Sequence, residues 1–147
     1  MRFHSHTART IALFGSLALV SVAPASRAQT TGGPPVIPDN AAALEGQPTV
    51  RVDATKAGAT RRKLGSAEAA RQSLKISVVG GRYYWTSRDN APLELSTSGD
   101  FLYLSSNKPG QYVRVRKLND KISYVEHVDT EFGSVTFWGE LRIALRK

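Results

Sequence analysis

The chain has 147 residues, a formal net charge of +8 and no cysteine. Without cysteine it has no disulfide, no thiol nucleophile and no metal site built from thiolates. A chain of this length holds one domain, whose stability must come from an apolar core and from hydrogen bonds.

Residues 1–28 have the three parts of a secretory signal peptide. Arg2 and Arg9 make a basic start, residues 11–23 form an apolar stretch of the usual length, and small residues follow. We predict cleavage after Ala28, with cleavage after Ala25 as the alternative. An uncleaved membrane anchor is a further alternative, but so short an apolar stretch does not span a bilayer core of about 30 Å unaided. The mature protein is therefore expected to be periplasmic or secreted, in a bacterial envelope, with no transmembrane segment after signal cleavage.

Residues 29–64 are rich in Pro, Gly and Ala and show no apolar repeat. Such a composition offers too little apolar surface to offset the entropy of ordering the segment. We predict a flexible tether here, in which residues 49–52 are a candidate for a short edge strand. Most of the net charge of the mature chain lies between residues 51 and 75. The basic end of the tether is therefore suited to anionic lipid, polysaccharide or nucleic acid, or it simply keeps a linker in solution.

Residues 65–147 are predicted to form a small all-β domain. It begins with one short helix over residues 66–72, with Ser66 as the N-cap. Isolated helices of this length are marginally stable, so we expect the helix only if it docks on the sheet.

From Leu74 onward, apolar and polar residues alternate, as in strands with one buried face. Three two-residue turns fall between the alternating runs: Gly80-Gly81, Gly99-Asp100 and Asn119-Asp120. Each turn fixes the register of its two strands, and each register places the apolar residues of both strands on one face. The central predicted pairs are Ile76 with Trp85, Leu95 with Leu104, and Val115 with Tyr124.

In the last apolar run, residues 135–145, the apolar residues fall on every second position both before and after Gly139. This pattern predicts a single long strand bent at this glycine. Sequential hairpins with one apolar face bury that face by closing on themselves or by folding over. The predicted fold is therefore all-β: a small antiparallel up-and-down barrel or a rolled sheet of about seven strands.

The sequence contains no motif typical of a catalytic or cofactor site. It has no Gly-x-Ser-x-Gly elbow and no phosphate-binding glycine loop, and the mature chain keeps a single histidine, His127. We therefore predict no catalytic residue, no metal site and no cofactor. Glu126 is the one charged residue on the apolar face, opposite Val113, and we expect it at a rim or beside Arg82 or Arg142.

The outward face is the best candidate for a functional surface. The register of the Asn119-Asp120 turn puts Tyr112 across from His127, with Arg114 and Arg116 on the same side. Aromatic rings interleaved with arginines stack on sugars or bases and hold anionic groups. The other aromatic residues predicted to face outward are Tyr84, Phe101, Tyr103 and Trp138. The alternative is that the tether, the short helix or a partner strand covers these rings.

We therefore expect an exported, non-enzymatic β-domain of the bacterial envelope that binds an envelope polysaccharide, another anionic polymer or another protein. The sequence indicates no specific recognition of nucleic acid. A small secreted hydrolase or inhibitor that acts through loop residues is one alternative, and a structural envelope protein is another. Carboxylates from different loops that converge in a cleft would favour the hydrolase.

Overall fold

The computed structural model describes residues 32–147. The predicted signal peptide, its cleavage site and the first residues of the predicted tether lie outside this range. The elements in chain order are β1 (Gly32–Gly33), β2 (Ala41–Thr55), β3 (Gly58–Lys63), α1 (Ser66–Arg71), β4 (Leu74–Val79), β5 (Arg82–Trp85), β6 (Ala91–Ser98), β7 (Phe101–Ser106), β8 (Gln111–Leu118), β9 (Lys121–Thr130) and β10 (Gly133–Leu145).

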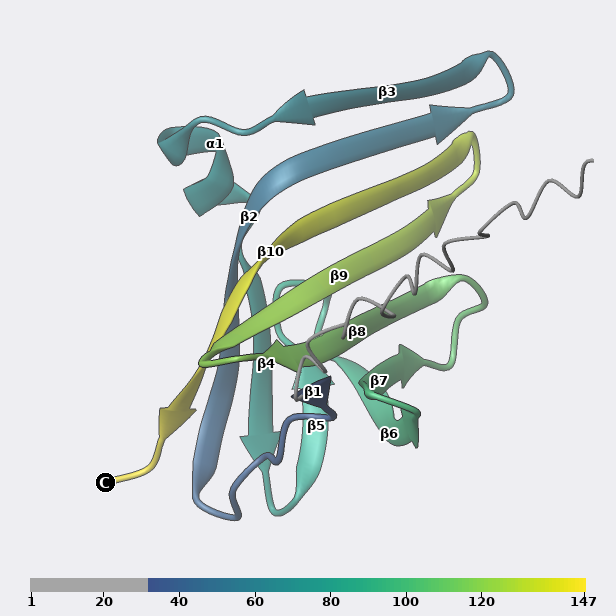
Figure 1. The fold of residues 1–147 in the computed structure, drawn as a ribbon. Helices are drawn as coiled ribbons and strands as arrows, with labels where there is room; N and C mark the ends of the chain where they lie inside the picture. The colour runs from purple at the N-terminus through teal and green to yellow at the C-terminus, as the bar shows by residue number, and fades with distance from the viewer. Residues whose placement is uncertain (1–31) are drawn as a thin grey trace, which may run out of the picture.

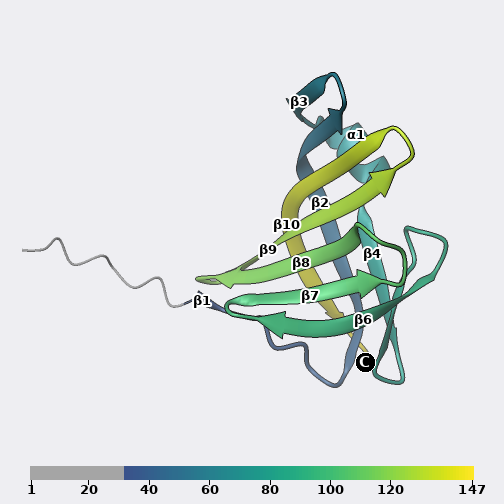
Figure 2. The same cartoon turned by 90° about the vertical axis from the view of Figure 1, so that its right-hand side faces the viewer.

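Eight of these strands form one closed antiparallel barrel, which Figure 1 and Figure 2 show from two sides. Around the ring the order is β2-β4-β5-β6-β7-β8-β9-β10, which is also their order along the chain, and β10 pairs with β2 to close it. β1 and β3 lie outside the ring, paired with β8 and β2 respectively. The up-and-down barrel is thus confirmed. It has one strand more than the seven predicted, and that strand is β2.

β2 lies within the segment predicted to be a flexible tether, and that prediction is wrong for β2 and β3. β2 pairs with β10 along the whole of β10 and with the first part of β4. Its inward residues are Leu44, Gly46 and Pro48, and then, past a shift of register, Arg51 and Asp53. Because only Leu44 among them is large and apolar, the alternation that marks a half-buried strand is missing from the sequence.

The registers predicted at the three two-residue turns are confirmed. Gly80, Gly99 and Asn119 each have the positive φ that a tight hairpin turn requires. Leu95 departs from the predicted burial and is 43% exposed. Leu95 is on β6, and the adjacent strand β5 pairs with β6 only as far as Leu93. Leu95 therefore lies beyond the end of β5.

Tyr124 and Trp85 are the largest fully buried side chains of the core. The ring of Tyr124 lies against the backbone of two glycines: an added Cβ would stand 2.5 Å from Tyr124 Cε1 at Gly46 and 2.8 Å from it at Gly139. Gly139 is also where the register between β2 and β10 shifts. The single long strand with an irregularity at Gly139 is therefore confirmed, and the two glycines make room for the Tyr124 ring.

The segment between β1 and β2 packs against one end of the barrel. Pro35 and Ile37 lie beside inward residues of β2, β7, β8, β9 and β10. Pro35 is buried and Ile37 packs against the core. This part of the predicted tether is therefore also part of the fold.

α1 lies beside β2, outside the barrel, as Figure 1 shows. Ala69 is buried, and Glu68 pairs with Arg62 of β3 at 2.6 Å, so the helix is docked. The predicted N-cap is wrong: Gly65 holds that position in an extended conformation, its carbonyl accepts a hydrogen bond from the Ala69 amide, and Ser66 is the first helical residue. Within residues 32–147 no helix is long and apolar enough to cross a membrane.

Trp85→Ala should lower the free energy of unfolding by about 3–5 kcal/mol, because Trp85 is fully buried and pairs with Ile76 across the core. Tyr84→Ala, one residue away on the outward face, should cost about 1 kcal/mol, since its ring is only half-buried. Chemical denaturation measures both values. Equal losses would contradict the inward and outward assignment of β5.

Candidate functional site

The outward face of β7, β8 and β9 carries a continuous row of aromatic rings. The ring centroids of Phe101 and Tyr103 are 6.3 Å apart, and those of Tyr103 and Tyr112 are also 6.3 Å apart. Tyr112 stacks on His127 at 5.2 Å with an angle of 25° between the rings. The row arises because Tyr112 pairs directly with His127 across β8 and β9, as the Asn119-Asp120 turn predicts.

Two arginines of β8 share one ring of this row. The guanidinium carbon of Arg114 lies 4.7 Å from the centroid of Phe101, and that of Arg116 lies 5.4 Å from it. Arg116 also reaches Asp100 at 3.3 Å, whereas Arg114 makes no ion pair within the described part of the chain. Cation–π contacts of this kind hold a guanidinium in place while its edge stays available to an anion.

All four residues predicted as a site, Tyr112, Arg114, Arg116 and His127, are thus brought together with Phe101 and Tyr103. We call these six residues the aromatic–arginine strip. Each of them is half-buried, so the strip is fixed by its neighbours and still has solvent-exposed surface.

His127 is held at both ring nitrogens. Nδ1 lies 2.9 Å from the hydroxyl of Thr136, and Nε2 lies 3.1 Å from a carboxylate oxygen of Asp129. These contacts orient the imidazole face against Tyr112. The arrangement suits His127 to stacking rather than to proton transfer with Glu126, which points to the opposite face of β9.

Two further aromatic residues were predicted to face outward. Trp138 is 38% exposed and pairs with Val125 of β9, which in turn pairs with Arg114, so it lies next to the strip. Tyr84 is on β5, which β6 separates from β7, and it takes no part in the strip.

Glu126 is not at a rim, and its partner is neither Arg82 nor Arg142. It is 1% exposed and accepts a hydrogen bond of 3.1 Å from Nε of Arg88, whose Nη2 lies 3.0 Å from the same oxygen. The reason is that β9 and β10 continue well beyond this point, so Glu126 has Val113 and Phe137 as paired neighbours on both sides. Burial raises the pKa of Glu126, and the charge of Arg88 opposes that rise.

A second ion pair lies at the same end of the barrel. Nε of Arg51 donates to both carboxylate oxygens of Asp53 at 2.9 Å, and this hydrogen bonding lowers the pKa of Asp53. Phe137 lies between two guanidiniums, with Arg51 at 5.5 Å and Arg88 at 5.9 Å from its ring centroid. This cluster is not predictable from the residue pattern, because charged residues on a strand are normally outward.

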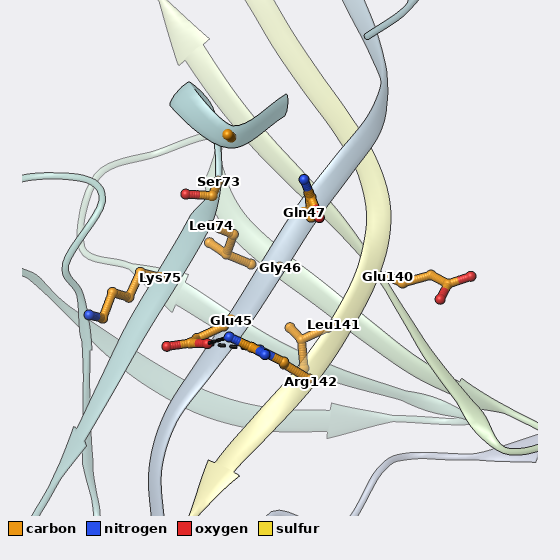
Figure 3. A pocket seen from close by; sticks show the side chains of 10 residues that line it. Glu45, Gly46, Gln47, Ser73, Leu74, Lys75, Glu140, Leu141 and Arg142 are labelled. Atoms are coloured by element: carbon orange, nitrogen blue, oxygen red, sulfur yellow. Dashed lines mark hydrogen bonds and ion pairs between the residues drawn. The ribbon is translucent and has the colours of Figure 1, made fainter. Parts of the chain in front are cut away.

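A cleft of about 620 Å³ opens below α1, where β2 lies between β4 and β10 (Figure 3). Two carboxylates line it, and each has a basic partner: Glu45 pairs with Arg142 at 2.6 Å, and Glu140 pairs with Lys121 at 2.6 Å. Both carboxylates come from strands rather than from loops. The cleft therefore lacks the converging loop carboxylates that would favour a hydrolase. In residues 32–147 no cluster of three or more His, Asp or Glu side chains is placed to hold a metal ion.

Comparisons of the chain with models of known families, with curated proteins and with solved structures return no match.

The Glu126 carboxyl should make stability depend on pH. Its pKa is raised in the folded state, so as pH falls from neutral the folded protein takes up a proton before the unfolded chain does, and the free energy of unfolding rises in that window. Arg88→Met removes the opposing charge and should cost about 2 kcal/mol at pH 7, less than the full cost of breaking a buried pair because Arg88 is partly exposed.

Denaturation at a series of pH values measures this effect. The loss in Arg88→Met should shrink as pH is lowered, and Glu126→Gln in the same background should restore stability at pH 7. Arg82→Met, which removes an exposed arginine from β5, is the matched control. A pH-independent loss in Arg88→Met would show that packing, not the buried charge, is what Arg88 provides.

Proposed function

We propose that this protein is an exported, non-enzymatic binding domain whose aromatic–arginine strip holds an acidic polysaccharide of the bacterial envelope. The observation that carries the proposal is the position of Arg114 and Arg116, both stacked on Phe101 beside the rings of Tyr103 and Tyr112. Sugar rings stack on aromatic faces, and a planar guanidinium matches the two oxygens of a carboxylate. The strip offers both kinds of contact side by side.

The other polar groups of the structure support a binding role over catalysis. The inward carboxylates of Glu126 and Asp53 are paired with Arg88 and Arg51, and those of the cleft below α1 are paired as well. These ion pairs neutralise the groups that acid–base chemistry would need. The signal-like sequence of residues 1–28 supports export, which would bring the domain into contact with envelope polymers.

Replacing both Arg114 and Arg116 by Ser should weaken binding of polygalacturonate about tenfold or more, which corresponds to at least about 1.4 kcal/mol. The binding of wild type should also weaken with added salt, because the contacts of the strip are partly exposed to solvent. Isothermal titration calorimetry measures the affinity, and circular dichroism confirms that the variant folds.

The pair Lys75→Ser and Arg82→Ser is the matched control, because it removes two exposed positive charges from β4 and β5, away from the strip. Neutral dextran is the ligand control. Equal losses of affinity in the two double variants would show that binding depends only on net charge, and would exclude the strip as the site.

A further inference from the structure

We infer that the aromatic–arginine strip is one end of a longer binding track that crosses six strands and ends on the basic strand β3. The inference rests on the proposed function and adds the form of the ligand: a linear acidic polysaccharide that lies across the strands and has carboxylates bound at both ends of the track.

The strand registers place one continuous row of outward residues across six neighbouring strands. Directly paired residues of antiparallel strands share a face, so a row can be followed from pair to pair: Tyr103, Arg114, Val125, Trp138, Val50 and Lys63. A parallel row runs from His127 through Thr136 and Val52 to Arg61. Both rows begin at the strip and end on a cation of β3.

The exposure of β10 shows which face this is. Trp138 is 38% exposed, whereas the neighbouring Phe137 is 3% exposed and faces inward. Val50 pairs with Trp138 and with Lys63, so Lys63 lies on the outward face. Arg62 pairs with Arg51 and lies on the opposite face of β3. There the side chain of Arg62 forms an ion pair with Glu68 of α1 at 2.6 Å.

The track has cations at its ends and apolar side chains in the middle. Lys63 and Arg61 are exposed and make no ion pair within residues 32–147, and Arg114 makes none either. Between these ends, Trp138 and three valines, Val125, Val50 and Val52, present ring and methyl surface. This order of groups suits a chain of sugars whose faces stack in the middle while acidic groups bind at each end.

The strands that carry the track lie side by side. Figure 1 shows β3, β2, β10, β9 and β8 as neighbours with similar slant, and β3 pairs on one side only, with β2. Six strands at the usual spacing of about 4.8 Å span roughly 24 Å. A track of that width covers several linked sugars, whereas the strip alone spans three strands. Lys and Arg on an edge strand also discourage edge-to-edge aggregation, and the experiment below separates that role from binding.

Calorimetry with galacturonate oligomers of increasing length tests the track. Wild type should gain affinity with length until the oligomer reaches β3. Arg61→Ser with Lys63→Ser should bind short oligomers as wild type does and should lose about tenfold for long ones. Lys56→Ser with Arg62→Ser is the matched control, because it removes two positive charges from the same hairpin, at its turn and on its other face.

The outcomes separate the track from the proposed function. Equal affinity of the two β3 double variants for long oligomers, with Arg114→Ser and Arg116→Ser still impaired, overturns the track and leaves the strip as the site. No binding of any oligomer by wild type overturns the proposed function and the track together. Tighter binding of an oligo-dT of equal charge would overturn the assignment to a polysaccharide.

Discussion

The structure depends on the pairing of the first barrel strand with the last. β2 and β10 are separated by all of residues 56–132, yet they pair along the whole of β10. Six of the other seven junctions in the ring join strands that follow one another along the chain, and at the seventh only β3 and α1 lie between β2 and β4. Without the β2–β10 ladder, the hairpins would form an open sheet with its apolar face and its edges exposed to water. Gly46 and Gly139 belong to this ladder, and the core residue Tyr124 packs on both of them.

Closure gives every strand one inward and one outward face. Charged side chains have different partners on the two faces. Inward, Glu126 and Asp53 each have a guanidinium partner, Arg88 and Arg51, which offsets part of the cost of placing a carboxylate there. Outward, Arg114 lies over the ring of Phe101 and has no acidic partner in residues 32–147, while Arg116 lies over the same ring and also reaches Asp100 at 3.3 Å. The proposed binding surface therefore holds two positive charges in place, and that of Arg114 is not neutralised by a carboxylate of the described residues.

Much of the barrel could be predicted from the sequence, because its registers are local. A two-residue turn with Gly or Asn at positive φ fixes which residues pair on either side of it. The pairing of Tyr112 with His127 follows from Asn119-Asp120 by counting alone. Four residues of the aromatic–arginine strip were predicted together for the same reason. The place of Phe101 and Tyr103 beside them depends on the pairing of β7 with β8, which no two-residue turn fixes.

The main missed features require information from distant parts of the chain, whereas the misplaced N-cap is a local error of one residue. β2 has small or charged inward residues, such as Gly46 and Arg51, and only its pairing with β10 shows that it is a strand. The partner of Glu126 is Arg88, 38 residues away in the loop after β5, which strand parity does not reveal. Trp138 and Lys63 likewise lie on one row only because β2 lies between β10 and β3.

A nuclear magnetic resonance titration of the isotope-labelled protein with a long galacturonate oligomer tests the central claim most directly. The backbone amides of β7, β8 and β9 should shift, together with those of β10, β2 and β3 along the two outward rows. Amides of β4 and β5 and of the cleft below α1 should stay unchanged. Shifts centred on that cleft, or no shifts at all, would contradict the assignment of ligand binding to this outward face.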